Sequence, residues 1–87
     1  MPLYRVERFV GDITPIEIDA GAYRALLCQN LIEGVRWIRS FYDAEAQRFT
    51  CYYEASRPDD LRSHADYAGL PCDSVTEVVE YLPDSYR

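Results

Sequence analysis

The sequence predicts an α+β fold in which two helices cover one face of a four-stranded antiparallel sheet. Strand and helix patterns follow one another in the order β-α-β-β-α-β, and helix-start and helix-stop signals flank both helical segments. A short polar loop joins the two central strand patterns, as in a β-hairpin. This order gives a ferredoxin-like βαββαβ sandwich. The chain has 87 residues, so we expect one domain spanning residues 1–87.

The first strand and the first helix are predicted from alternation and from capping residues. Leu3–Val10 alternates as a strand and ends at Gly11. Thr14 is a natural helix cap, and Glu17 completes a capping box with it across Pro15. We expect the helix to continue to a stop at Gly34. Its apolar residues recur at helical spacing at Ile16, Ala20, Tyr23, Leu27 and Leu31.

The rest of the chain is predicted as a hairpin, a helix and a final strand. Val35–Tyr42 and Arg48–Ala55 are rich in aromatic and β-branched residues, which favours strands. The second helix begins near Pro58 and ends at Gly69, and the last strand is expected over Val75–Leu82. The second helix carries an apolar stripe at Leu61, His64, Ala65 and Ala68.

Large apolar side chains are expected on both faces of the sheet. In the second strand, Val35, Trp37 and Phe41 share one parity and Ile38 and Tyr42 the other. A solvated face would show clean apolar and polar alternation. Two helices cover only one face, so we expect a homodimer packed through the sheet faces.

Composition and charge exclude several classes of function. The formal net charge of -6 argues against a nucleic-acid partner, because such binding needs an excess of basic residues. No apolar run is long enough to span a membrane, and the N-terminus lacks the layout of a secretion signal. The three cysteines form neither a CxxC motif nor an even disulfide set. We therefore expect a cytoplasmic protein with no membrane partner.

The one histidine, His64, is the first candidate for chemistry. It lies about 9 Å along its helix from the helix start, at 1.5 Å per residue. Cys51 lies about 10 Å back from the end of its strand, which runs antiparallel to that helix, so the two residues are expected level with each other. Tyr53 shares the parity of Cys51. Cys51, Tyr53 and His64 are expected to line one small pocket.

Three interpretations of this pocket stay open. A thiolate with an imidazole could begin a site for nickel, zinc or another divalent transition metal. A buried neutral His64 donating to a carbonyl or to the Tyr53 hydroxyl explains the same pattern, as does a proton-transfer role. Glu7 and Glu54 are further candidate metal ligands on the opposite face, where they could also pair with arginines.

The aromatic residues suggest an alternative function. Trp37 and eight tyrosines could wall a cavity for a small aromatic molecule, either in a binding module or in a cofactor-free enzyme. Core and interface packing explains the same residues. In the enzyme case, His64 and Tyr53 would be the acid–base groups of a pocket walled by Trp37.

An ordered set of short motifs resembles one known family. The set comprises Val6-Glu7-Arg8, Gly34-Val35-Arg36-Trp37 with Ser40, Cys51-Tyr52-Tyr53-Glu54-Ala55, Pro58, His64-Ala65, Ala68-Gly69-Leu70-Pro71 and Val75-Thr76-Glu77-Val78. Together these resemble a family of small bacterial proteins of unknown function, and the resemblance is strongest from Gly34 to Val78. The resemblance implies a dimeric ferredoxin-like fold, and one family member is described as nickel-binding. On that basis we expect a non-enzymatic nickel-type metal-binding protein without an organic cofactor.

Overall fold

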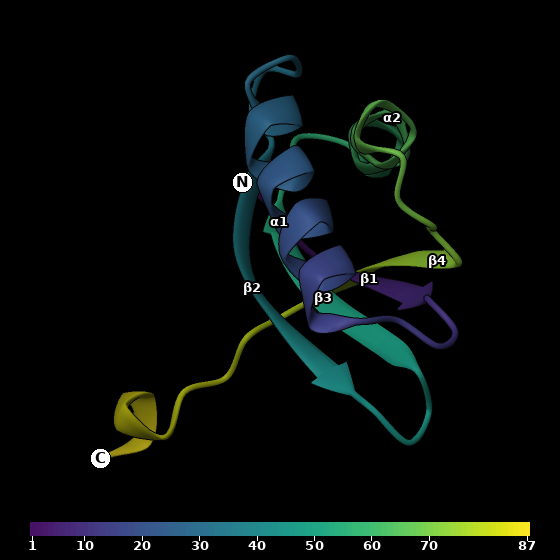
Figure 1. Ribbon diagram of the computed structural model, residues 1–87. Coiled ribbons are helices and arrows are strands. Elements are labelled where there is room, and N and C mark those ends of the chain that lie inside the picture. Colours follow the sequence, from purple (N-terminus) through teal and green to yellow (C-terminus); the bar gives the residue numbers. More distant parts are fainter.

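The computed structural model describes all residues from Met1 to Arg87. The chain forms four strands, two α-helices and a short C-terminal 3-10 helix. Figure 1 shows how these elements are arranged. Their bounds are β1 Leu3–Phe9, α1 Pro15–Gln29, β2 Arg36–Asp43, β3 Arg48–Glu54, α2 Pro58–Ala68, β4 Ser74–Val78 and η1 Pro83–Tyr86.

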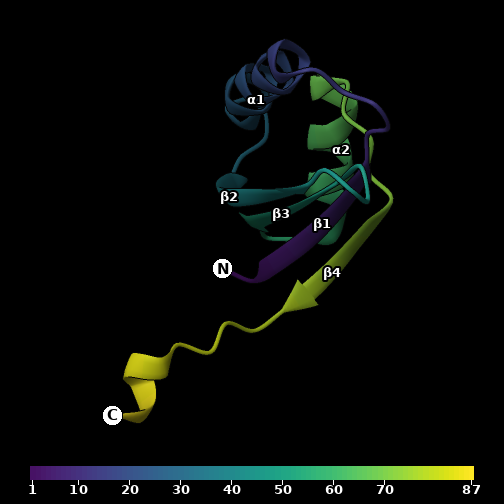
Figure 2. The same cartoon turned by 60° about the horizontal axis from the view of Figure 1, so that its bottom comes forward.

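The strands form one antiparallel sheet in the order β2-β3-β1-β4. Both helices lie on the same face of this sheet, and the other face has no helix over it (Figure 2). The predicted α+β fold and its βαββαβ order are therefore confirmed.

The core lies between the sheet and the helices. The strands contribute Tyr4, Val6, Cys51 and Tyr53, all buried. Val6 is opposite Cys51 and Tyr4 is opposite Tyr53, so these four side chains share the covered face. Leu61 of α2 joins this cluster.

A β-bulge in β2 changes which side chains face the helices. Trp37 pairs with Tyr53, but the register shifts before Arg39, so Ser40 rather than Arg39 aligns with the covered side. Phe41 pairs with Thr50 and lies on the uncovered face. The expectation that Trp37 and Phe41 share a face is wrong, because the extra residue of the bulge reverses the alternation of side chains beyond it.

Helix α1 begins as predicted but presents a different side to the core. Its Thr14 capping box with Glu17 is present, and the helix ends at Gln29 rather than near Gly34. The inward positions are Gly21 and Ala25, because α1 runs close to its neighbours: a Cβ added at Gly21 would lie 3.4 Å from Leu70. The apolar stripe used to predict the helix faces outward instead, at Ile16, Tyr23, Leu27 and Leu31.

Helix α2 follows its prediction closely. Its stripe of Leu61, His64, Ala65 and Ala68 is buried. Gly69 ends the helix with a positive φ of 67° and donates its N–H to the Ala65 carbonyl. A left-handed residue of this kind favours glycine.

The last strand is shorter than predicted. It ends at Val78, which is opposite Leu3 at the start of β1, so the chain beyond Val78 has no strand to pair with. The C-terminal segment leaves the body of the domain and ends in η1 (Figure 1). This segment exposes Val79, Tyr81, Leu82 and Tyr86. None of the helices has the length and apolar character needed to cross a membrane.

Candidate functional site

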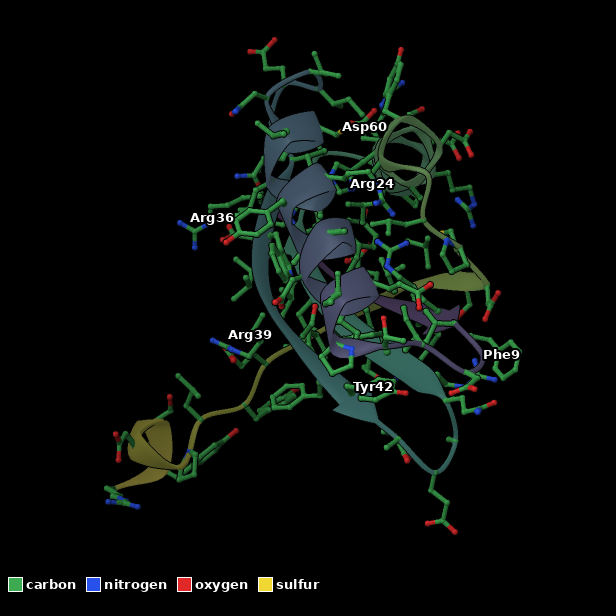
Figure 3. All side chains as sticks on the ribbon, viewed as in Figure 1. Phe9, Arg24, Arg36, Arg39, Tyr42 and Asp60 are labelled. Atoms are coloured by element: carbon green, nitrogen blue, oxygen red, sulfur yellow. The ribbon has the colours of Figure 1, made fainter.

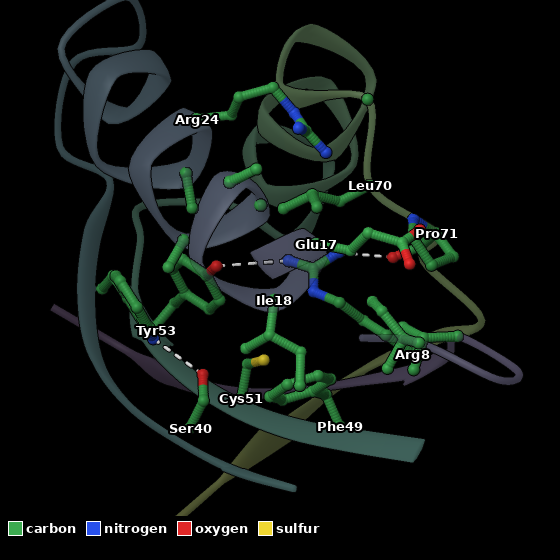
Figure 4. Close-up of a pocket in the computed structure, with 18 residues that line it drawn as sticks. Arg8, Glu17, Ile18, Arg24, Ser40, Phe49, Cys51, Tyr53, Leu70 and Pro71 are labelled. Atoms are coloured by element: carbon green, nitrogen blue, oxygen red, sulfur yellow. Dashed lines mark hydrogen bonds between the residues drawn. The ribbon is translucent and has the colours of Figure 1, made fainter. Parts of the chain in front are cut away.

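A cavity of about 390 Å³ lies between α1 and the covered face of the sheet. Residues of β1, β2 and β3 line one side, α1 lines the other, and the loop at 69–71 closes one end (Figure 4). The lining is mostly hydrophobic. Its size falls in the range of small-molecule pockets, about 300–1,000 Å³.

The strands supply an aromatic floor. Trp37, Phe49 and Tyr53 line the cavity together with Cys51 and Ser40. The bulge in β2 brings Trp37 and Ser40 to the same face, where the Trp37 indole N–H donates to the Ser40 hydroxyl at 2.9 Å. The Trp37 ring is thus held in one orientation.

Four of the seven α1 residues that line the cavity have a methyl side chain or none. Gly21, Ala22 and Ala25 lie along the side of the helix that lines the cavity. At Gly21 the helix backbone comes so close to Leu70, another lining residue, that an added Cβ would lie 3.4 Å from it. The small residues therefore keep this stretch of α1 from filling the cavity with its own side chains.

Arg8 brings a buried positive charge to this apolar cavity. Its exposed fraction is only 3%. One terminal nitrogen donates to the Pro71 carbonyl, and the other donates to the Tyr53 hydroxyl at 3.2 Å. Burial works to lower the Arg8 pKa, but the facing Tyr53 hydroxyl and Cys51 thiol outweigh it, so the pKa is raised and the guanidinium stays charged.

Tyr53 completes the polar end of the cavity. The guanidinium of Arg8 lies 5.8 Å from the centre of its ring. Burial raises the pKa of Tyr53, although the charge of Arg8 opposes this shift. The hydroxyl is therefore protonated at neutral pH, and it accepts one hydrogen bond from Arg8 while keeping its own proton to donate.

Arg24 lies on α1 beside the same loop. Its Nε donates to the Ala68 carbonyl at 2.7 Å, and a Cβ added at Gly21 would lie 3.8 Å from its Nη2. Its guanidinium extends toward the loop at Leu70 (Figure 4). Neither Arg8 nor Arg24 has a carboxylate within 4.0 Å, whereas the other arginines all do.

His64 lies near this cavity but is not among the residues that line it. Its Nε2 lies 2.8 Å from the Ala25 carbonyl, and its ring is edge-on to Tyr53 at a centroid distance of 5.4 Å. Its Nδ1 is buried without a hydrogen-bond partner. Burial lowers the pKa of His64. The hydrogen bond to the Ala25 carbonyl opposes this shift and the charge of Arg8 adds to it, and the net lowering leaves a neutral imidazole that donates Nε2–H to Ala25. Trp37, Cys51 and Tyr53, the other residues expected here, do line the cavity.

The candidate metal ligands are divided between the two faces of the sheet. Glu7 and Glu54 lie on the uncovered face: both Glu7 oxygens accept from the Thr50 hydroxyl, and Glu54 pairs with Arg36 at 2.9 Å. Arg36 projects outward from β2 (Figure 3). Cys51 and His64 lie on the covered side. No three His, Cys, Asp or Glu side chains of one chain are grouped so that they could hold a metal ion.

Comparison with known proteins identifies the family. A family described as "Nickel responsive protein SCO4226-like" matches residues 4–78, which is most of the chain. This chain belongs to the SCO4226-like family.

One solved structure supports the same grouping at the level of the fold. The crystal structure of SCO4226 from Streptomyces coelicolor A3(2) superposes with a TM-score of 0.82 at 16% sequence identity. The alignment covers 92% of this chain and 99% of that chain. No curated protein matches the chain. The resemblance to a small bacterial family is thus confirmed, and the description of that family is nickel responsive.

Sequence reasoning singled out neither arginine of the cavity in this SCO4226-like chain. Arg8 has the same parity as Tyr4 and Val6, so strand alternation alone places it on the buried face. A charged residue at a buried parity is a signal for a site. Arg24 gives no such signal, because it lies on an exposed part of α1.

Proposed function

We propose that this chain is a non-enzymatic binding protein that holds a small molecule with one or two rings in the cavity between α1 and the sheet. The observation that carries this proposal is the cavity itself, with an aromatic floor and an α1 wall in which Ala20, Gly21, Ala22 and Ala25 are small. Flat aromatic side chains such as Trp37 and Phe49 favour a ring-bearing ligand. The three cysteines are free thiols, which agrees with our proposal of a cytoplasmic location.

Binding is favoured over catalysis by the position of the titratable groups. His64, the residue type best suited to proton transfer near neutral pH, does not line the cavity. The Tyr53 hydroxyl does, but burial raises its pKa, so it does not act as a base at neutral pH. The groups that face the ligand are therefore suited to holding it.

The proposal is tested with Trp37, the one tryptophan of the chain. We expect 2-naphthoate or its neutral amide to shift the indole N–H resonance of Trp37 in a saturable way. Gly21→Met would place a side chain in the cavity and abolish this shift, whereas Leu26→Met on the same helix, outside the lining, would leave it unchanged. If neither compound moves the resonance, or if Gly21→Met binds as well as the natural chain, the proposal is wrong.

Nickel binding is a second candidate, favoured by the description of the family as nickel responsive. One chain does not group enough ligands, so we propose a site shared between two copies. Glu7 lies four positions along β1 from Leu3, the partner of Glu54, so the two carboxylates are about 13 Å apart on one face. A two-fold axis between them would bring Glu7 of one copy to Glu54 of the other.

The homodimer that this site requires is also a proposal. The uncovered face bears a groove of about 330 Å³ lined by Leu3, Arg39, Phe41, Tyr52, Val78, Val79 and Glu80. Apolar residues of this size on an open sheet favour a partner surface. A second copy packed through this face would cover them.

Metal analysis tests the nickel proposal on untagged protein loaded with nickel. We expect bound nickel that is lost in Glu7→Gln or Glu54→Gln and retained in Glu45→Gln, which alters an exposed loop carboxylate. His64→Ala tests the interpretation of the sequence in which His64 is a metal ligand. The two-fold axis generates two equivalent sites, so nickel well below two per dimer, or nickel binding unchanged by both carboxylate variants, would reject the shared site.

A further inference from the structure

We propose that the ligand of this cavity is an organic carboxylate whose negative charge is bound by Arg8 and Arg24. This inference rests on the proposed small-molecule function and specifies its ligand class. The ring would lie against the aromatic floor, and the carboxylate would lie at the end closed by the loop at 69–71 (Figure 4).

The ion pairs of this chain leave out the two arginines of the cavity. The chain has 15 acidic and 9 basic residues, and all the basic residues are arginines. Seven of these arginines lie between 2.9 and 3.5 Å from a carboxylate oxygen. The two that have no carboxylate partner, Arg8 and Arg24, both line this cavity. With acidic residues in excess, their lack of partners is a local feature of the site.

Arg8 is buried without an opposite charge beside it. A buried charge is strongly unfavourable unless an opposite charge or several hydrogen bonds offset it. Both hydrogen-bond partners of Arg8, the Pro71 carbonyl and the Tyr53 hydroxyl, are neutral. The five N–H groups of a guanidinium exceed these two bonds, so donors remain for a ligand. An anion in the cavity would supply the missing charge.

Hydrogen bonds to backbone carbonyls hold both guanidiniums in position before a ligand arrives. Arg24 bonds to the Ala68 carbonyl and Arg8 to the Pro71 carbonyl, so the two arginines flank the same short segment. The Tyr53 hydroxyl fixes the other side of Arg8. Donors that are already oriented lose little freedom on binding.

Glu17 is the one acidic residue that lines this cavity, and it does not neutralise either arginine. Its Oε1 accepts from the Thr14 backbone N–H at 3.2 Å and from the Thr14 hydroxyl at 2.9 Å. These bonds hold the carboxylate at the start of α1, more than 4.0 Å from both guanidiniums. Glu17 belongs to the helix cap and leaves the charge of Arg8 unmatched.

A carboxylate fits better than a phosphate ester. Planar guanidinium and carboxylate groups form paired hydrogen bonds and match in charge one to one. The lining is mainly apolar, with a single buried arginine, so it has too little positive charge to balance a doubly charged group. The expected ligand is a monocarboxylate with one or two rings.

The test compares 2-naphthoate with its neutral amide, which has nearly the same shape. Titration at neutral pH, followed by the Trp37 indole resonance, is expected to show about tenfold tighter binding of the acid, as for a charge-assisted hydrogen bond. Arg24→Gln is expected to remove most of this preference while the amide still binds. Arg36→Gln, at a paired arginine of the uncovered face, is the matched control and should leave the preference intact.

The outcomes separate this inference from the proposed function. Equal affinity for acid and amide, or a preference unaffected by Arg24→Gln, overturns the carboxylate inference while the small-molecule function stands. Tighter binding of 2-naphthyl phosphate than of the acid would also overturn it. Failure of both naphthalene probes to move Trp37 rejects the proposed function itself. Arg8→Gln is a further variant, interpreted only if its circular dichroism and melting transition are those of a folded chain.

Discussion

His64 shows how burial sets the protonation state of one residue. Its Nε2–H donates to the Ala25 carbonyl and its Nδ1 has no partner, so protonation would place a charge in the core. Burial lowers its pKa below the usual value of 6.5. The unfolded chain therefore takes up this proton at a higher pH than the folded chain does. The contribution of neutral His64 to stability is fully present at a pH above its pKa in the unfolded chain. It is lost as the pH falls below about 6.5.

We predict that the free energy of unfolding decreases between pH 7 and pH 5 and that His64→Gln makes this decrease smaller. The glutamine amide can still donate to the Ala25 carbonyl but does not titrate. Urea denaturation at several pH values measures the slope. Equal slopes for the two proteins would show that His64 does not titrate in this range.

Tyr53→Phe is predicted to destabilise the fold by about 1–3 kcal/mol, because it leaves a buried N–H of Arg8 without its acceptor. Tyr52→Phe is the matched control. Tyr52 is the preceding residue of β3, on the uncovered face, and we expect a change within about 0.5 kcal/mol. Chemical denaturation of both variants gives the comparison, and similar losses in the two would argue against a structural role for the Tyr53 hydroxyl.

Alternation in β3 was enough to predict that Cys51 and Tyr53 share the covered face. Alternation did not place Trp37 and Phe41 correctly, because one extra residue in β2 inverts the parity. No residue type in this segment indicates a bulge. The cavity itself could not be predicted, since it arises where Gly21 and Ala25 approach residues distant in sequence.

At the scale of elements, the start of α1 depends on the reciprocal bonds between Thr14 and Glu17. The Thr14 hydroxyl accepts from the Glu17 N–H at 3.2 Å, and the Glu17 carboxylate binds the backbone and hydroxyl of Thr14. We predict that Thr14→Ala lowers the free energy of unfolding by about 1 kcal/mol. Thr14→Ser keeps a capping hydroxyl, so most of the capping free energy is retained. Thermal or urea melts of the two variants measure this, and equal stabilities would contradict the prediction.

In the middle of α1, a substitution is expected to stabilise the fold. Gly21 lies in a regular helix, and an added Cβ would meet Leu70 at 3.4 Å, an ordinary contact distance. Gly21→Ala is therefore predicted to raise the free energy of unfolding by up to about 1 kcal/mol. A loss of stability in the same measurement would mean that the neighbouring Leu70 cannot adjust.

The sequence located both helices but not the inward face of α1. Large apolar residues at helical spacing are usually core residues, but in α1 the close approach of α2 and the loop at 69–71 admits only small side chains. In α2 the same kind of stripe did identify the buried face, because that helix packs on the sheet through Leu61.

At the scale of the whole molecule, the uncovered sheet face leads to a prediction about assembly. Phe41 and Tyr52 lie edge to face at a centroid distance of 6.3 Å on this face, and Phe41 is 60% exposed. We predict that sedimentation equilibrium gives twice the 10.1 kDa mass of one chain. Phe41→Asp should shift this to the single-chain mass, because it places a charge in the apolar interface.

Tyr67→Asp is the control, since Tyr67 is also highly exposed but lies on α2, away from the sheet face. A single-chain mass for the natural protein at micromolar concentration would reject the homodimer and the shared nickel site with it. The small-molecule proposal does not depend on this result, because the cavity is complete within one chain.

The bulge in β2 also bears on the solubility of the protein at high concentration. β2 is an edge strand, and a flat edge strand presents free N–H and C=O groups in a regular row that can recruit strands from other molecules. The register shift between Trp37 and Arg39 interrupts that row. Growth of intermolecular β-structure from this edge, the first step toward fibrils, would therefore meet a mismatch after only a few residues.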